Sequence, residues 1–175
     1  MKKELRLEVK ELKQYNLKKI LKIDVNVKQV GSDRLANAIS VINDKDNFII
    51  LDFGTATTFD VVLRNRYKGG IIAPGVNLSL KTLIEKAKLI PNTKLKKIKN
   101  IIGKNTQNAV RSGFYWGYQG LIENIINLIK KKYKKEFKII FTGGLSHLYK
   151  NTIQKKVQVD KDLTIKGLFK LIDKI

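Results

Sequence analysis

The sequence predicts an α/β fold, in which helices and strands alternate along the chain and pack in layers. Apolar runs of strand length are mixed with segments of helical periodicity throughout the 175 residues. Two glycine-rich turns, one after residue 51 and one after residue 141, each follow such an apolar run. The hydrophobic content of 43% is sufficient for a folded domain with a real core, and no linker or repeat divides the chain.

The first third of the chain predicts helix, strand and helix in that order. Residues 4–22 are Lys-rich and amphipathic, and the candidate inward positions of this helix are Leu5, Val9, Leu12, Leu17, Ile20 and Leu21. Residues 23–30 alternate between apolar and polar types, which predicts a short strand. A second helix is expected from Gly31 to about residue 43, with Ser32 or Asp33 as its cap.

The most informative stretch runs from Asp52 to Asp60, between an apolar run at 48–51 and another at 61–63. It predicts a strand, a tight turn and a return strand. Gly54 allows backbone N–H groups to approach a phosphate closely, and Thr hydroxyls such as that of Thr55 add short donors. Asp52 at the strand end can hold a cation or a water beside that phosphate. The alternative is an ordinary polar β-hairpin.

The remaining elements follow from the same patterns. In order, we expect a strand at 67–73, a helix from Pro74 to about 89, a loop at 91–103, the longest helix from Asn105 to about 132, a buried strand at 137–141, a glycine turn at 142–144, a short helix, a strand at 157–159 and a last helix from Leu163. The longest helix carries Gly113, Gly117 and Gly120 at helical spacing. Each Gly costs a helix roughly 1 kcal/mol relative to Ala, so we expect close approach by another backbone, either within the chain or from a subunit partner.

Composition excludes several classes of function. The chain has no cysteine, which excludes disulfides, Cys-zinc sites and thiol catalysis and makes the cytoplasm the default location. No apolar run is long enough for a transmembrane helix, and the basic N-terminus lacks the apolar core of a signal peptide. The single histidine, His147, is expected to be a surface or packing residue.

The net charge of +21 raises the question of a nucleic-acid partner. The basic residues are overwhelmingly Lys, whereas specific recognition of bases and phosphates favours the planar Arg fork, so we do not expect a dedicated nucleic-acid reader. Because the chain is also rich in Ile and Asn, we favour a compositional drift of the whole sequence as the explanation of the charge, with a selected basic surface as the alternative.

Six tracts, in this order, resemble type III pantothenate kinase: Gly31–Arg34, Asp52–Thr58, Gly69–Gly75, Gly103–Thr106 followed by Ser112 and Gly113, Thr142–Gly144, and Asp162–Leu168. They cover the chain from about residue 25 to its end. The resemblance implies an actin-like kinase fold, with two ribonuclease-H-like halves around a nucleotide cleft. It also implies a homodimer that phosphorylates pantothenate to 4'-phosphopantothenate, the first step of coenzyme A biosynthesis, with ATP, Mg²⁺ and a monovalent cation, K⁺ or NH₄⁺.

The resemblance also assigns roles to residues of the second predicted helix. Gly31, Ser32, Asp33 and Arg34 would bind pantothenate, with the Arg34 guanidinium paired to its carboxylate. Asp33 would be the general base on the attacking hydroxyl, and a helix cap is its alternative role.

Three further positions receive roles in the same way. Asp52 would coordinate the monovalent cation, or else be a turn acid. Thr55 would contact the ATP phosphates. Thr106 would contact pantothenate from the other subunit, or else cap the longest helix, and the glycine turn at 142–144 would lie near the nucleotide or be a simple tight turn.

The family begins with a strand and a phosphate loop of the form Asp-x-Gly-Asn-Thr, and no such motif precedes Gly31. We therefore expect residues 1–30 to be a remnant of an incomplete N-terminal half-domain and residues 31–175 to be the C-terminal ribonuclease-H-like kinase domain, with little kinase activity for the chain alone. A late start, a split or decaying gene and a shortened protein stay open. The alternative functions are a non-catalytic binding or transcription-accessory protein, or another phosphotransferase or phosphatase of the superfamily.

Overall fold

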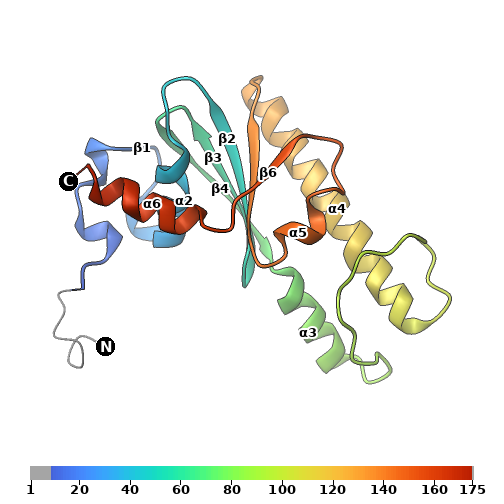
Figure 1. The fold of residues 1–175 in the computed structure, drawn as a ribbon. Helices are drawn as coiled ribbons and strands as arrows, with labels where there is room; N and C mark the ends of the chain where they lie inside the picture. Colours follow the sequence, from blue (N-terminus) through green and yellow to red (C-terminus); the bar gives the residue numbers. More distant parts are fainter. Residues whose placement is uncertain (1–8, 175) are drawn as a thin grey trace.

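A six-stranded sheet with helices on both faces forms the body of the protein (Figure 1). The structure is a computed structural model that describes residues 9–174. The strands lie in the order β1-β4-β3-β2-β5-β6. Their bounds are β1 Lys22–Ile23, β2 Asn47–Phe53, β3 Ala56–Leu63, β4 Arg66–Pro74, β5 Lys138–Gly143 and β6 Val157–Val159.

The order of the five longer strands gives the sheet a ribonuclease-H-like topology. β2, β3 and β4 form an antiparallel meander, and β5 and β6 then continue the sheet in parallel beside β2. The helices α2 Ser32–Val41, α3 Val76–Lys86, α4 Thr106–Tyr133, α5 Ser146–Tyr149 and α6 Leu163–Ile172 connect or follow these strands. The predicted fold class, an α/β fold built from a ribonuclease-H-like half-domain, is confirmed.

Two hydrophobic clusters bury the two faces of the sheet. Helices α2 and α6 cover one face, where residues such as Ile50 and Val62 lie in the cluster that contains Leu35 and Leu171. Helices α4 and α5 cover the other face, where Ile49 and other odd-numbered residues of β2 and β3 meet α4. Figure 1 shows these two pairs of helices on opposite sides of the strands. Because both faces are covered, β2 reads as a continuous apolar run rather than an alternating one.

A side-chain cap marks the start of the long helix α4, and a left-handed residue marks its end. The side chain of Asn105, its N-cap, accepts a hydrogen bond from the backbone N–H of Asn108 (2.9 Å). Lys134 ends the helix in the left-handed conformation, with φ of 50°. The prediction of a long helix from about Asn105 is confirmed, and the capping role considered for Thr106 belongs to the residue before it.

The N-terminal helix prediction is wrong over the described residues 9–22. This segment forms two short 3₁₀ turns, η1 Leu12–Gln14 and η2 Leu17–Lys19, and then β1. Three of the expected inward residues, Leu12, Leu17 and Leu21, are nevertheless buried in the cluster under α2, while Val9 is exposed. Leu5 lies outside the described residues.

The predicted strand at 23–30 is also largely replaced. β1 ends at Ile23, and the 3₁₀ turn η3 Val27–Gln29 follows it. Val30 packs into the same cluster as α2 and the leucines of the N-terminal turns. The proposed division of the chain at residue 30 stays a prediction.

The three glycines of α4 face open space within the described chain. A Cβ added to Gly113, Gly117 or Gly120 would meet nothing within 4 Å among residues 9–174. The first of the two expected causes, close approach by a helix of the same chain, is therefore wrong for the part of the chain that the structure describes.

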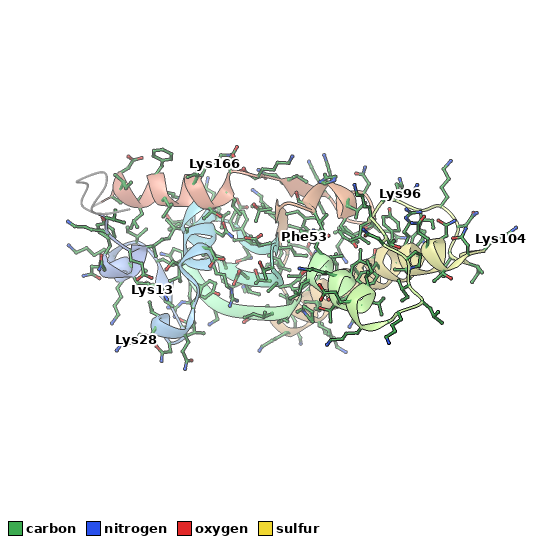
Figure 2. The ribbon with its side chains drawn as sticks, turned by 90° about the horizontal axis from the view of Figure 1, so that it is seen from below. Lys13, Lys28, Phe53, Lys96, Lys104 and Lys166 are labelled. Carbon is green, nitrogen blue, oxygen red and sulfur yellow. The ribbon has the colours of Figure 1, made fainter. Side chains whose placement is uncertain are left out.

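The positive charge is spread over the molecule and is not gathered at one place. Figure 2 shows Lys13 and Lys28 at one end, Lys96 and Lys104 at the other, and Lys166 on α6 between them. In the described residues, no helix is long and apolar enough to cross a membrane.

Candidate functional site

The first turn of α2 and its N-cap carry four of the predicted site residues, Gly31, Ser32, Asp33 and Arg34. Gly31 is the N-cap, with φ of −59° and ψ of 143°, and makes no side-chain cap bond because it has no side chain. The Oγ of Ser32 donates to Glu11 Oε1 (2.9 Å), which ties the start of the helix to the N-terminal segment. Asp33 is exposed, and no residue within 9–174 donates a hydrogen bond to it. Asp33 is therefore not the helix cap and presents a free carboxylate.

Arg34 is held by a buried partner, Asp60 of β3. Its Nε donates to Asp60 Oδ1 (2.9 Å) and Oδ2 (3.2 Å), and its Nη2 donates to Oδ1 (2.7 Å). The Arg34 side chain is 12% exposed and that of Asp60 is 1% exposed. Burial alone lowers the pKa of Arg34, but the hydrogen bond and the charge of Asp60 outweigh it, and the pKa is raised. The guanidinium therefore stays charged.

Asp60 accepts hydrogen bonds from two more side chains of the sheet. Tyr67 donates its hydroxyl to Oδ1 (2.6 Å), and Thr58 donates its hydroxyl to Oδ2 (3.4 Å). Burial raises the pKa of Asp60, and the bonds from Arg34, Tyr67 and Thr58 oppose that rise. Burial and the Asp60 charge also raise the pKa of Tyr67, so Tyr67 remains a donor.

Asp52 lies near the end of β2, on the α2 side of the sheet. It is half-buried, and Asn37 of α2 donates to its Oδ2 (3.2 Å). Thr164 of α6 in turn donates to Asn37 Oδ1 (2.7 Å), so two helices fix the orientation of this amide. Burial raises the pKa of Asp52, and the charges of Asp33 and Asp60 raise it further. The local field therefore favours a positive ion or a proton beside Asp52.

The strand register sets Asp52 in a row of side chains across the sheet. Asp52 pairs with Thr142 of β5 on one side and with Thr58 of β3 on the other, and Thr58 pairs with Ile72 of β4. Residues paired in register point to the same face of a sheet. The row therefore forms a floor of two hydroxyls, one carboxylate and one apolar side chain next to the first turn of α2.

The β2–β3 hairpin lies beyond this row. Gly54 and Thr55 form its turn and are exposed, and Gly54 N–H donates to the carbonyl of Ala56 (3.0 Å). The backbone of Thr55 contacts Gly75, where any side chain would collide with the Thr55 carbonyl. The exposed turn therefore joins β2 and β3 at the end of the sheet where Asp52 lies.

The second glycine turn approaches Asp52 from β5. Gly143 has φ of +81°, and a Cβ there would lie 2.5 Å from Asp52 Oδ1 and 2.7 Å from the backbone N of Phe53. Only glycine combines this conformation with so close an approach. The turn therefore has a specific packing role beside the carboxylate.

Thr106 is the predicted site residue that the fold does not bring to the others. It is exposed at the start of α4. Figures 1 and 2 both set this end of α4 at the opposite end of the molecule from α2. The single histidine, His147, is exposed on α5, as expected for a surface residue.

The described residues contain no group of three or more acidic, His or Cys side chains that could hold a metal. A cation at Asp52 would thus have one carboxylate and would complete its shell with carbonyl oxygens, water or a phosphate.

Sequence reasoning missed Asp60, Asn37 and Tyr67. Asp60 carried a usable signal, because a charged residue inside an apolar strand is almost never fully buried without a partner. Asn37 likewise interrupts the apolar face of α2 and is completely buried. Tyr67 gave no comparable signal, because tyrosine is common in strands.

Comparison with known proteins gives a consistent match. Residues 1–128 match the family model described as type III pantothenate kinase. A type III pantothenate kinase of Pelagibacter ubique is 64% identical over 169 residues, which cover 97% of this chain and 68% of that protein. One from a Ruegeria species is 43% identical over 153 residues, 85% of this chain and 59% of that protein. This chain spans between 54% and 68% of the length of these two proteins and of four further type III pantothenate kinases.

A solved structure supports the fold alone. A conserved protein of Campylobacter jejuni, described as a transcriptional activator of the Baf family, has a TM-score of 0.66 and covers 93% of this chain and 75% of its own. Its sequence identity is 24%.

Proposed function

Because the chain belongs to the type III pantothenate kinase family, we propose that it takes part in the ATP-dependent phosphorylation of pantothenate to 4'-phosphopantothenate, the first step of coenzyme A biosynthesis. The observation that carries this proposal is the first turn of α2. It presents an unpaired, exposed carboxylate, Asp33, directly beside a fixed guanidinium, Arg34.

The two charges suit the two ends of the substrate. Pantothenate carries a carboxylate at one end and a primary hydroxyl at the other. Arg34 would bind the carboxylate, and Asp33 would accept the proton of the hydroxyl as it attacks the γ-phosphoryl group. Gly31 and Ser32 would line the same site. Phosphoryl transfer asks little covalent chemistry of the protein, so positioning and charge neutralisation carry the catalysis.

The sheet edge would contribute the nucleotide and cation contacts. Thr55 in the exposed turn would donate to the ATP phosphates, and Asp52 would hold K⁺ or NH₄⁺, which neutralises phosphate charge. Burial raises the pKa of Asp52, and the nearby charges of Asp33 and Asp60, which raise it further, support a cation there. Mg²⁺ would arrive with ATP, and we assign it no ligand among the described residues.

A homodimer would bring Thr106 to the pantothenate site of a second copy. Its position far from α2 and the open glycine side of α4 support this arrangement. Beside these glycines, Pro74, Leu83, Phe114, Tyr118 and Leu121 line an apolar groove between α3 and α4. Sedimentation velocity tests the dimer, and a monomer at micromolar concentration would contradict it. The cytoplasm, where ATP and coenzyme A synthesis are found, is the proposed location.

Product formation from the purified chain is the direct experiment. Mass spectrometry would follow 4'-phosphopantothenate in the presence of ATP, Mg²⁺, K⁺ and pantothenate. Turnover that Asp33→Asn abolishes supports the proposal, and turnover that this variant leaves unchanged removes Asp33 from the base role. Pantothenate binding without turnover would mean that these residues hold the acceptor but that transfer needs surfaces that they do not supply.

A further inference from the structure

We propose that Asp60 is a positioning residue, which fixes the Arg34 guanidinium so that its unused edge faces the carboxylate of the acceptor substrate. This inference rests on the proposed function, because it concerns the same site. It adds a buried acid on β3 that has no contact with substrate and acts only through Arg34.

The geometry of the ion pair with Asp60 leaves one edge of the Arg34 guanidinium unused. A guanidinium has five N–H groups in one plane. The Nε and one Nη2 N–H of Arg34 are used on Asp60. Nη1 has no hydrogen-bond partner among residues 9–174. The edge that contains Nη1 is therefore the part of Arg34 that remains for a ligand.

Three side chains hold the carboxylate of Asp60 in a fixed orientation. Its two oxygens accept from Tyr67 of β4 and Thr58 of β3, as well as from Arg34. Both partners stand on neighbouring strands of one sheet, so the carboxylate cannot rotate without losing bonds. An acid held in this way fixes the guanidinium plane and not only its charge.

The sheet leaves space for the Arg34 guanidinium at Gly70 of β4. Gly70 pairs in register with Asp60, and a Cβ there would collide with Arg34 Nη2 and with the carbonyl of Phe59. The guanidinium therefore lies against bare backbone of β4. On the same face, the next residue of β4 is Ile72, which is 65% exposed. Along β4, the position where the Arg34 guanidinium lies is therefore followed by an exposed apolar side chain.

The charge of Asp60 has an effect on the site that is distinct from its effect on the orientation of Arg34. Asp60 neutralises Arg34, so the site gains no large net attraction for anions from this pair. With Asp33 and Asp52 nearby, a loosely oriented guanidinium would be drawn to those carboxylates instead of the substrate. A fixed Arg34 can bind a planar carboxylate through directed hydrogen bonds without being captured by its acidic neighbours. Position, and not charge, is what Asp60 contributes.

The test compares two ligands that differ only in the charged end. Pantothenate carries the carboxylate, and its alcohol analogue, pantothenol, carries a neutral hydroxyl in its place. Titration calorimetry on the full chain gives the ratio of the two dissociation constants. The variants are Asp60→Asn and the matched control Asp46→Asn, which alters an acid paired to Lys138 near the other end of β2.

We expect Asp60→Asn to weaken pantothenate binding by about tenfold or more while leaving pantothenol binding unchanged. Asp46→Asn should keep the wild-type ratio. A general structural defect would weaken both ligands equally, so an unchanged ratio in Asp60→Asn overturns the inference. Tighter pantothenate binding would also overturn it, because it would mean that the freed charge matters more than its position.

Two further measurements cover a variant that does not fold. Tyr67→Phe removes one support of Asp60 and keeps the ion pair, and we expect a smaller shift of the same ratio. In the wild-type chain, the Nε proton of Arg34 should exchange slowly with solvent, and fast exchange would overturn the fixed orientation. If the wild-type chain binds neither ligand, the proposed function fails and this inference fails with it. If the wild-type chain binds pantothenate and Asp60→Asn keeps the wild-type ratio of the two dissociation constants, the inference alone fails.

Discussion

Asp33 and Arg34 are consecutive residues in the first turn of α2, yet Asp33 is exposed and accepts no hydrogen bond from the described residues, whereas Arg34 is locked onto the buried Asp60. The first turn of α2 thus presents one exposed carboxylate beside one fixed cation. This contrast is what a site needs when it must remove a proton from one end of a substrate and hold the other end still.

Replacement of the base should separate activity from stability. Relative to whatever turnover the wild-type chain shows, we expect Asp33→Asn to lower phosphoryl transfer by about 10²–10⁴-fold, the usual contribution of a general base. The melting temperature should change little, because Asp33 is exposed and makes no bond within residues 9–174. Product formation and circular dichroism measure the two effects. A large loss of stability would mean that Asp33 supports the fold.

The ion pair to Asp60 should be essential for stability. Asp60→Ala leaves the Arg34 charge buried without a partner, and we expect a loss of about 3–5 kcal/mol in the free energy of unfolding. Urea denaturation measures this loss. Asp46→Ala breaks a surface pair to Lys138 and should cost far less. Equal effects of the two substitutions would contradict the buried character of the Arg34 pair.

Much of the fold followed from local pattern, and the reason is visible in particular elements. The run around Ile49 and Leu51 and the glycine turn after it could only be a buried strand and a hairpin. The long segment that begins at about Asn105 predicted α4, although the cap is Asn105 and not Thr106 as considered. In these segments, local preference and the global fold agree.

The N-terminal segment shows where local pattern fails. Leu12, Leu17 and Leu21 fit a helical spacing and are indeed buried, but they reach the core from two 3₁₀ turns. Their burial is decided by the contact with α2 and not by helix propensity, so tertiary packing overrides the periodicity.

The residues of the candidate site also divide into those that could be predicted from the sequence and those that could not. Asp33, Arg34, Asp52 and Thr55 lie on short tracts that could be found from sequence. The partner of Arg34 is 26 positions away, on strand β3, so only the packing of α2 on the sheet brings it into contact. Thr106 lies far from these residues within the described chain, and its contact with pantothenate from a second copy stays a prediction.

The raised pKa of Asp52 predicts a specific pH dependence. A carboxyl whose folded pKa lies above its ordinary value of 3.8 stabilises the fold fully below that value, and the stabilisation is lost as the pH rises through the folded pKa. At neutral pH, Asp52→Asn should therefore be more stable than the wild-type chain, and the gain should shrink in acid. The Asn side chain can still accept the bond from Asn37.

Melting temperatures of both proteins across the range from about pH 3 to pH 7 measure this difference. Added K⁺ should raise the melting temperature of the wild-type chain and not that of Asp52→Asn, because a bound cation stabilises only the protein that holds it. A K⁺ effect of equal size in both proteins would exclude Asp52 as the ligand.

The two adjacent glycines after β5 give a matched pair. Gly143→Ala sets a Cβ 2.5 Å from Asp52 Oδ1 at φ of +81°, so we expect a loss of at least about 1–2 kcal/mol from the backbone conformation alone. A Cβ at Gly144 would meet nothing within 4 Å among the described residues, so Gly144→Ala should be nearly neutral. Urea denaturation compares them, and similar stabilities would show that the turn tolerates a side chain at both positions.

The binding of pantothenate at the first turn of α2 is the central claim, and an NMR titration of the isotope-labelled wild-type chain tests it most directly. With saturating pantothenate, we expect the largest shift changes at the backbone amides of Gly31–Arg34 and at the guanidinium of Arg34. ATP should instead perturb the turn at Gly54 and Thr55. Pantothenate binding at this turn is contradicted if millimolar pantothenate leaves the first turn of α2 unchanged, or if the shift changes are confined to other parts of the chain.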